Sequence, residues 1–470
     1  KDYKMDDLVI KAGMEIGDDQ WVGVKFGHYE NDANISYRGL FLQDYKDRKT
    51  YNPGTDDYFL TERNSFDVNH EWDINDTTTL KTVVYWSEMN RDYWRYSVDN
   101  DLSAAAGRWV FKDTLSGKNR TFTRTGIDSR LNFSHNTFGI KNQAEVGIRL
   151  LNESMHNRSI SATRSHDRSG DLGSHKQDSA KSIAAFAENR FEINDRLAIT
   201  PGLRIENYEQ TSKDLKKGGS ESTSNTEVLP GIGATYQLSD SAQLFGGAYQ
   251  AFSPAQNSDA LDGLSDQKLE AERSVNMELG IRGQTKNLSY EAVAFQMDFS
   301  NQIVDSSSLN YTVTNVGKTI HQGIEAALGY NFGGGFAVNT NLTYIPVSEF
   351  VGGDYDGNRI SYSPEWLANA EVSYTQGGLQ TALSMHYSGS QFGDSANTKD
   401  IPADASGGIW GGELDAYTTF DLNARYQVNK QLDVFGAVKN LTDERYIAGL
   451  RQGIYAGPSR SFELGAKYQF

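Results

Sequence analysis

Strict alternation of apolar and polar side chains is the feature of this sequence that most constrains its fold. Between 461 and 470 the apolar residues are Phe462, Leu464, Ala466, Tyr468 and Phe470, and each residue between them is polar or glycine. A period of two places successive side chains on opposite faces of a β-strand. The pattern recurs at 66–74, 145–150, 197–206, 275–282 and 417–428. The sequence therefore predicts an all-β chain.

The length of these strands and the charges on them narrow the choice of β architecture. Several run for about ten residues, whereas soluble sheets favour about five or six and about 9–11 tilted residues cross a bilayer. The polar face carries Arg282, Arg425 and Glu463. Burying such charges inside a sandwich would be costly. A wide antiparallel barrel, with one face toward lipid and one toward water, accommodates both faces.

Composition agrees with this architecture and excludes others. The 470 residues include no cysteine, which excludes disulfide frameworks and thiolate metal sites. The net charge of −17 argues against a nucleic-acid partner. Only 37% of the residues are hydrophobic and no run approaches 18 apolar residues, so no membrane-spanning helix is expected. A barrel strand stays polar on average, because only alternate side chains face lipid.

Short and long connections alternate along the chain, as they do in outer-membrane barrels. Short turns rich in Gly, Asn and Asp are expected, for example at 17–19, 75–76 and 333–335. Long connections are expected near 31–63, 97–118, 154–178, 210–225, 253–271, 304–316, 347–362, 389–413 and 441–460. This division predicts about 19 strands. Three further strands before the first would give 22, the class of plugged transporters.

Three motifs in the second half of the chain resemble signatures of one receptor family. They are Asn440-Leu441-Thr442-Asp443 with Gly457-Pro458-Ser459-Arg460 and the final strand; Asn315-Val316-Gly317 with Gly323-Ile324-Glu325; and Leu269-Glu270-Ala271-Glu272 with Glu278-Leu279-Gly280. Together they resemble TonB-dependent outer-membrane receptors. Tyr85–Arg91, Tyr249–Gln256 and Thr319–Leu328 are most similar to the ferric dicitrate transporter branch.

The resemblance implies much of the expected biology. Residues 1–470 would be the barrel domain of a 22-stranded receptor in the outer membrane of a Gram-negative bacterium, without its first strands and without the N-terminal plug. The cargo would be a ferric siderophore, most similar to ferric citrate, and uptake would be energised by the TonB–ExbB–ExbD complex through the plug. Loops near 253–271 and 304–316 would close over the ligand. No cofactor is expected, and ferric iron enters only within the chelate.

Four residues match ligand-contacting positions of that branch. Arg91 lies near the loop end of strand 79–96, Arg120 begins the strand after loop 97–118, Arg158 lies just past strand 138–154, and Gln256 follows strand 242–252. Arginine pairs carboxylates through two parallel hydrogen bonds, and glutamine could complete the set. The resemblance therefore implies that Arg91, Arg120, Arg158 and Gln256 bind the chelate from the lumen.

Two other groups of side chains stand out. Loop 154–178 is basic within an acidic chain, and it predicts an anion funnel at the mouth, a contact with lipopolysaccharide phosphates or simply a solvated loop. Tyr85, Trp86, Tyr93, Trp94 and Tyr96 could stack on a ligand, but they favour an aromatic girdle at the membrane interface.

Three alternatives remain open at this stage. The first is a receptor for another cargo, such as another siderophore, haem, cobalamin or a sugar. The second is a passive porin, which needs no plug but usually has fewer strands. The third is a barrel enzyme, against which the absence of a catalytic constellation argues. The sequence favours a receptor that catalyses no reaction.

Overall fold

The computed structural model describes residues 2–469, except 138, 167, 270, 302, 307–311, 316 and 403–410. Glu270, Val316, Phe470 and part of the predicted loop 304–316 therefore lie outside the described residues. The rest of the chain forms one antiparallel sheet of 19 strands, three small two-stranded sheets and a few short helices. This confirms the prediction of an all-β chain with 19 main strands.

The main sheet consists of β1 (Tyr3–Ile16), β2 (Gln20–Ala33), β3 (Tyr58–Asn75), β4 (Thr78–Val98), β5 (Phe111–Thr137), β6 (Ile140–Thr163), β7 (Asp171–Glu192), β8 (Leu197–Asp214), β9 (Ser220–Ser239), β10 (Ala242–Ser253), β11 (Glu272–Gln284), β12 (Leu288–Ser300), β15 (Lys318–Gly333), β16 (Phe336–Val351), β17 (Trp366–Gln376), β18 (Leu379–Ser388), β21 (Tyr417–Gln427), β22 (Leu432–Lys439) and β25 (Ser461–Tyr468). The small sheets pair β13 (Ile303–Ser306) with β14 (Thr312–Asn315), β19 (Gln391–Phe392) with β20 (Glu413–Leu414), and β23 (Ile447–Leu450) with β24 (Ile454–Ala456). The helices are α1 (Leu42–Lys46), α2 (Asn100–Ala106) and α3 (Asn257–Ala260), with single turns at η1 (Arg164–His166) and η2 (Asp262–Leu264).

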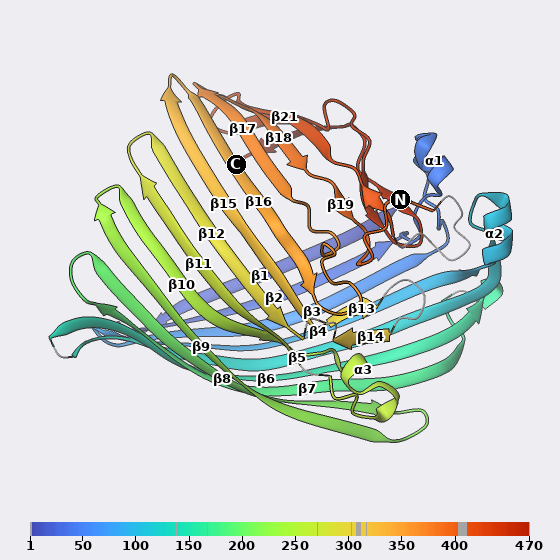
Figure 1. Cartoon of the computed structure of the whole chain (residues 1–470), viewed down its shortest axis with the longest axis horizontal. Coiled ribbons are helices and arrows are strands. Elements are labelled where there is room, and N and C mark those ends of the chain that lie inside the picture. Colours follow the sequence, from blue (N-terminus) through green and yellow to red (C-terminus); the bar gives the residue numbers. More distant parts are fainter. Residues whose placement is uncertain are drawn as a thin grey trace.

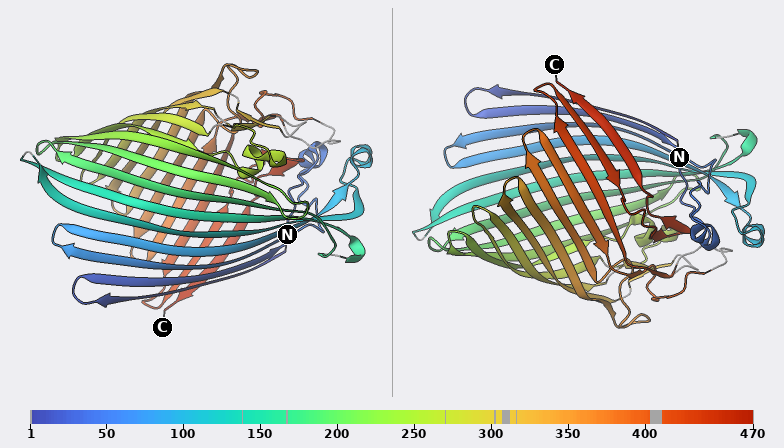
Figure 2. Two further views of the ribbon diagram at one scale, coloured as in Figure 1. Left: turned by 90° about the horizontal axis from the view of Figure 1, so that it is seen from below. Right: turned by 90° about the horizontal axis from the view of Figure 1, so that it is seen from above.

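Each main strand pairs with the one before it and the one after it in chain order, so the sheet is an up-and-down meander (Figure 1). The strands curl around a hollow, and the short turns lie at the end opposite the helices (Figure 1). Among the described residues, β1 pairs only with β2 and β25 only with β22. The sheet therefore curls into an open barrel whose edges, β1 and β25, are not paired with each other (Figure 2).

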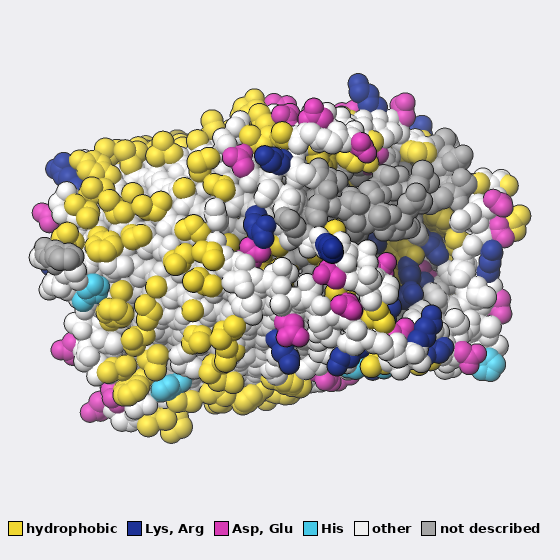
Figure 3. All heavy atoms as spheres, turned by 60° about the horizontal axis from the view of Figure 1, so that its bottom comes forward, with side chains coloured by type: hydrophobic (Ala, Val, Ile, Leu, Met, Phe, Trp, Pro, Cys, Tyr) yellow, Lys and Arg dark blue, Asp and Glu magenta, His cyan; other side chains and the backbone are white. Residues whose placement is uncertain are grey.

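Alternation along the strands separates an apolar outer face from a polar inner face. On the outer face Phe66 lies opposite Trp86 and Val68 lies opposite Val84, cross-strand pairs that build a continuous apolar surface. Large apolar side chains exposed in this way cover the half of the molecule that carries the short turns (Figure 3). Such a band is what a barrel presents to lipid. No helix of the described residues is long and apolar enough to cross a bilayer.

The inner face carries the charges that the alternation predicted there. Arg282 lies over the ring of Phe245, 4.9 Å from its centroid. Arg425 forms an ion pair of 2.5 Å with Asp433, and Lys439 forms one of 2.5 Å with Glu463. Arg282, Arg425, Lys439 and Glu463 are exposed on this face and so do not bear the cost of full burial, whereas Asp433 is buried against Arg425.

Two predicted long loops are mostly strand. β6 and β7 extend through the predicted loop 154–178 and leave only residues 164–170 between them. β8 and β9 likewise leave only residues 215–219 of the predicted loop 210–225. Both stretches are polar on both faces because they extend beyond the apolar band, so alternation no longer marks them as strand. The backbone pairing nevertheless continues to the tip of each hairpin.

Loops from opposite ends of the chain pack together at the long-loop rim. The backbone groups of Leu40 and Ile454 exchange two hydrogen bonds of 2.8 Å. Around them a buried apolar cluster also includes Phe41, Trp109 and Leu414. Burial of each such side chain stabilises the fold by about 1.5–3 kcal/mol. The rim is therefore held together across the gap that separates β1 from β25.

The pairing between β9 and β10 ends partway along β10, and the chain that follows β10 carries α3 onto the inner face of the barrel. β10 pairs with β9 only as far as Tyr249 opposite Gly231, beyond which β9 pairs with β8 alone. The chain after β10 turns onto the inner face, where the Asn257 amide donates to the carbonyls of Ser179 (2.7 Å) and Thr211 (3.1 Å). The predicted loop 253–271 thus projects α3 into the lumen beside β7 (Figure 1).

Candidate functional site

The first part of the site is a pair of arginines on the inner face. Arg91 on β4 lies directly opposite Arg120 on β5, and Arg120 lies opposite Asn157 on β6. Exposed Val84 and Trp86 mark the outer face of β4, so odd-numbered Arg91 points inward. The register therefore brings together two of the four predicted ligand residues.

The environment of Arg91 is unusual for a cation. Its Nε is buried and has no hydrogen-bond partner, and its guanidinium has no ion pair among the described residues. It lies 5.7 Å from the ring centroid of Phe122. Burial lowers the pKa of Arg91, and neighbouring Arg120 lowers it further. Two adjacent cations without a carboxylate favour an anion between them.

Further cations and aromatic rings continue this wall toward the mouth. Lys118 lies two residues before Arg120 on β5 and donates to the Ser159 hydroxyl at 2.9 Å. Burial lowers the pKa of Lys118, and Arg95 and Arg120 lower it further. The Arg95 guanidinium lies 4.3 Å from the ring centroid of Tyr37 and 5.0 Å from that of Tyr93. We call Arg91, Arg95, Lys118 and Arg120 the cationic wall.

Gln256 lies at the start of α3, which packs on the inner face against β7 and β8. It is the N-cap residue of α3, and its side chain makes no capping hydrogen bond. Together with Met89 and Phe122 it lines a cavity of about 530 Å³ on the inner face. Gln256 and Phe122 thus border one cavity, and Arg91 lies 5.7 Å from the Phe122 ring centroid, although neither Arg91 nor Arg120 lines that cavity.

Arg158 does not join this group. On β6 the exposed residues Val146, Ile148 and Leu150 mark the outer face, and the pairing runs without a bulge as far as Arg158. Arg158 thus lies on the outer face, opposite Asn119 and His175. The expectation that it faces the lumen is wrong, because β6 continues as a regular strand where a loop was predicted.

The predicted basic loop is not a funnel over the lumen. The tip of the β6–β7 hairpin contacts the outer side of β3 and β4, where Arg164 pairs with Asp56 at 2.7 Å. Arg164 also lies 4.3 Å from the ring centroid of Tyr96. Arg168 lies 4.1 Å from that of Tyr58. Both arginines thus contact carboxylates or aromatic rings on the outer side of the barrel.

The aromatic residues predicted to form a girdle all lie on β4, and some point outward while others point inward. Trp86 is exposed on the apolar band, in agreement with the prediction. Trp94 and Tyr96 are instead buried, 2% and 4% exposed, in a cluster with Leu115 on the outer face above the band. Tyr93 points inward, and its hydroxyl accepts a hydrogen bond of 2.8 Å from the Tyr37 amide. The girdle prediction is therefore wrong for Trp94, Tyr96 and Tyr93.

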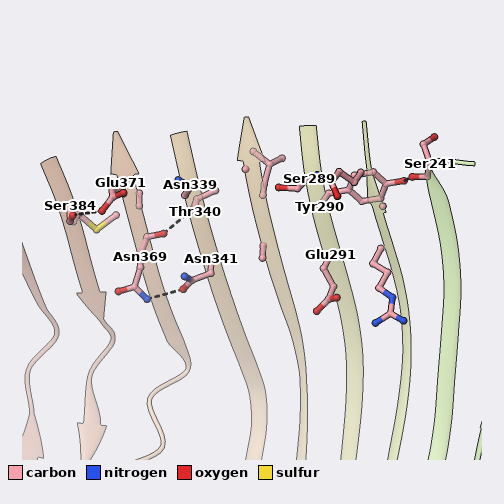
Figure 4. Close-up of a pocket in the computed structure, with 18 of the residues that line it drawn as sticks. Ser241, Ser289, Tyr290, Glu291, Asn339, Thr340, Asn341, Asn369, Glu371 and Ser384 are labelled. Carbon is pink, nitrogen blue, oxygen red and sulfur yellow. Dashed lines mark hydrogen bonds between the residues drawn. The ribbon is translucent and has the colours of Figure 1, made fainter. Parts of the chain in front are cut away.

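A second, larger cavity lies on the inner wall near the short turns. It has a volume of about 1060 Å³ and is lined by β10–β12, β15–β18 and β21. Its side chains are mainly amides, hydroxyls and carboxylates that bond to one another (Figure 4). Asn369 donates to Asn341 at 2.8 Å, and Ser384 donates to Glu371 at 3.0 Å. The arginine in this lining, Arg282, donates to Gln243 at 2.8 Å, whereas Arg91 and Arg120 of the cationic wall lie opposite each other.

The described residues contain no group of three or more His, Asp or Glu side chains that could hold a metal ion. Sequence reasoning did not single out Lys118 and Arg95 as site residues. Both could have been found by counting in twos from Arg120 and Arg91, which places them on the same faces of the same strands.

An open antiparallel barrel with an apolar outer band and a cationic inner wall defines the class of protein. The model of the TonB dependent receptor-like β-barrel family matches residues 12–441, so the chain belongs to that family. Family members are outer-membrane receptors and not enzymes, which confirms the predicted family and class.

Several proteins with similar sequences are named as receptors for particular ligands. The pesticin receptor of Yersinia pestis is 25% identical over 281 residues, which are 57% of this chain and 40% of the receptor. The ferrienterobactin receptor of Escherichia coli is 25% identical over 327 residues, which are 62% of this chain and 43% of the receptor. The chain thus spans less than half the length of these relatives.

Solved structures share the fold. The unliganded ferric citrate transporter FecA aligns with a TM-score of 0.88 at 23% identity, over 99% of this chain and 70% of that one. The ferric-catecholate import receptor Fiu of E. coli aligns with a TM-score of 0.78 at 17% identity, over 100% of this chain and 75% of that one. At these identities the likeness concerns the fold alone.

Proposed function

We propose that this chain is the barrel of an outer-membrane receptor that imports an anionic ferric chelate, with ferric citrate as the cargo. Arg91 and Arg120 carry the proposal, because they lie side by side on the inner wall without a carboxylate partner among the described residues. Citrate carboxylates would accept paired hydrogen bonds from both guanidinium groups. Gln256 would add an amide from the α3 side, and Arg158, on the outer face, is left out of the proposed site.

The rest of the receptor follows from the family. Three further strands between β25 and β1 would complete a 22-stranded barrel, and the free backbone groups of both edges support this closure. A plug inside that barrel would connect it to TonB and its partners ExbB and ExbD. Lipid and lipopolysaccharide would surround the apolar band. Residues 1–470 would all belong to the barrel domain.

Closure of loops over the chelate is the second element of the proposal. Segment 254–271 already enters the lumen and is held there by a few hydrogen bonds, such as that from Gln210 to the Ala255 carbonyl at 2.8 Å. A small movement of α3 would bring Gln256 toward a ligand on Arg91 and Arg120. Loop 304–316 would complete the closure, as the family resemblance implies.

The proposal is tested by titrating the purified protein in detergent while tryptophan fluorescence is recorded. Ferric dicitrate is expected to quench it saturably, whereas iron-free citrate and an iron-loaded hydroxamate siderophore are not. The Arg91→Ala variant should weaken the response, and the matched Arg158→Ala variant should leave it unchanged. If ferric dicitrate gave no response, the citrate assignment would be lost, and the family membership would stand.

A further inference from the structure

The segment between β16 and β17 folds back along the upper end of β16. We call residues 352–363 the strap. The Phe350 amide donates to the Asn358 carbonyl at 3.0 Å, and the Ile360 amide donates to the Ser348 carbonyl at 2.8 Å. The strap thus bonds to β16 in the part of that strand that β17 no longer pairs with.

Arg359 fastens the strap to its surroundings. Its Nε donates to the Ser363 carbonyl at 2.7 Å, and its Nη2 donates to the Ile345 carbonyl at 2.7 Å. Its backbone amide donates to the Asn397 side-chain oxygen at 2.7 Å, and the Asn397 side chain donates to the Arg359 carbonyl at 2.7 Å. One arginine therefore holds the strap against both the sheet and a loop of the rim.

Tyr362 extends these links to a second loop of the rim. Its amide donates to the Phe392 carbonyl at 2.8 Å. Its hydroxyl donates to the Leu450 carbonyl at 3.1 Å and accepts from the Leu450 amide at 3.0 Å. Leu450 belongs to the buried apolar cluster that joins the two ends of the chain. Movement of the strap would therefore loosen contacts in both loops.

A histidine on the inner face is connected to the strap through two hydroxyl groups. Pairing of β15 with β12 is regular between Ile324 and His321, so His321 lies on the face opposite the exposed Ile324. Its Nδ1 lies 2.9 Å from the Ser348 hydroxyl, which accepts a hydrogen bond of 2.8 Å from the Ser363 hydroxyl. Because Ser348 accepts from Ser363, its own hydrogen points to Nδ1, and Nδ1 must be free of a proton to accept it.

The surroundings of His321 disfavour a second proton on its ring. The Phe299 ring on β12 lies 5.5 Å from the imidazole between centroids. The strap contributes Arg359, which forms no ion pair among the described residues. Burial lowers the pKa of His321, and Arg359 lowers it further. Other charged groups of these elements lie on the outer face, further toward the short turns or at the ends of the strap, and include Asp298, Lys318, Glu349, Glu325, Asp356 and Glu365.

A proton on His321 would act on the strap in two ways. It would leave the hydrogen of Ser348, a residue only 1% exposed, without its acceptor. It would also place a second cation near Arg359. The pKa of His321 is lower with the strap in place than in an unfolded segment. The stability that neutral His321 contributes is therefore fully present above about pH 6.5 and is lost as pH falls.

We propose that His321 and the strap form an acid-sensitive latch of the long-loop rim. Neutral His321 accepts the Ser348 hydrogen and keeps the strap on β16. Protonated His321 releases the strap, and the two loops bonded to Tyr362 and Asn397 then loosen. This inference is independent of the cargo, because none of these residues belongs to the cationic wall.

Hydrogen–deuterium exchange on the full chain in detergent tests the latch. Protection factors, corrected for the intrinsic pH dependence of exchange, are compared at about pH 7.5 and about pH 5, on either side of the ordinary histidine pKa. In wild type, peptides covering 352–363 and 391–397 should lose protection several-fold at the lower pH, whereas peptides from β7 and β8 should keep it. His321→Gln retains an oxygen for the Ser348 hydrogen but does not titrate, so it should abolish the loss.

The matched control is His386→Gln, which alters a histidine of the polar cavity near the short turns and should retain the acid loss. If His321→Gln did not fold, Ser348→Ala would replace it. That variant should lower the protection of the strap at neutral pH and narrow the difference between the two pH values. Wild type without an acid loss, a loss of equal size in β7 and β8, or an acid loss that is unchanged in the variant would each overturn the latch.

Discussion

The inner and outer faces of β4, β5 and β6 differ sharply at the same height above the apolar band. Arg91 and Arg120 point inward and have no carboxylate partner among the described residues. One residue further along each strand, Asp92 and Asn119 point outward beside Arg158. Burial raises the pKa of Asp92, and Arg158 opposes that rise. The outer cation thus has an acidic neighbour, whereas the inner arginines have a ring and an amide beside them and no carboxylate among the described residues.

This difference shows that basic residues alone do not define a binding site. The basic hairpin tip at 164–170 drew attention in the sequence, yet its arginines are paired with Asp56 and Asp32 outside the lumen. Exposed pairs of this kind contribute little to stability or to attraction of distant anions. The inner pair, Arg91 and Arg120, has no carboxylate partner among the described residues, and Arg91 is partly desolvated by burial. An anion is therefore expected to bind more tightly beside the inner arginines than at the hairpin tip.

The largest expected effect comes from removing the inner pair. The Arg91→Ala/Arg120→Ala double variant should bind ferric dicitrate at least about 100-fold more weakly, because truncating one partner of a buried charge pair costs about 2–5 kcal/mol. Isothermal titration calorimetry in detergent measures the loss. Arg158→Ala serves as the control from the outer face. If Arg158→Ala lost as much affinity as the double variant, the distinction between the two faces would be refuted.

The second prediction concerns pH and separates Lys118 from the arginines. Its pKa is lowered in the free protein by burial and by Arg95 and Arg120, and a bound anion would raise it again. Ligand binding should therefore be strongest while Lys118 is protonated and should weaken as pH rises through its lowered pKa. A hydrogen bond to a charged group contributes about 1.5–3 kcal/mol, so the loss should be about tenfold or more.

Lys118→Met provides the control for that pH dependence. The variant should bind more weakly at neutral pH and should lose the alkaline decline. Affinities measured between neutral pH and the alkaline range, corrected for the ligand's own titration, decide the matter. An alkaline decline that persisted unchanged in Lys118→Met would assign it to another group.

A smaller effect is expected at the hairpin tip. Arg164→Ala removes an exposed ion pair with Asp56 and a ring contact with Tyr96, which together contribute about 1 kcal/mol. Thermal unfolding in detergent should shift by a few degrees at most. Ferric dicitrate affinity should not change, since the tip lies outside the lumen. A marked fall in affinity would instead restore the funnel interpretation.

The smallest effect concerns the histidines of the outer face. His156 and His175 share a hydrogen bond of 3.1 Å between Nδ1 and Nε2, so at least one of them must be neutral. The pKa of His175 is lowered by burial, by Arg158 and by His156. The pKa of His175 is lower in the folded protein than in the unfolded chain. The stability that neutral His175 contributes is therefore fully present above about pH 6.5 and is lost as pH falls. NMR titration should show the His175 pKa rising in Arg158→Ala, and an unchanged value would contradict the outer-face placement of Arg158.

The fold was predictable from sequence because lipid and water impose a strict alternation on every strand that crosses the band. The same rule fails above the band, where β6 and β7 are polar on both faces and Arg158 was assigned to a loop. Arg91 and Arg120 could be named from the family resemblance, but that they face each other depends on the register of β4 against β5. Register is set by pairing across the whole hairpin, which local sequence does not reveal.

The most direct test of the central claim is to locate the iron. Crystals of the protein grown with ferric dicitrate would show the metal as an anomalous scattering peak. The account predicts one peak on the inner face, with citrate oxygens within hydrogen-bond distance of the Arg91 and Arg120 guanidinium groups. A peak at the polar cavity near the short turns, or on the outer face beside Arg158, would contradict it.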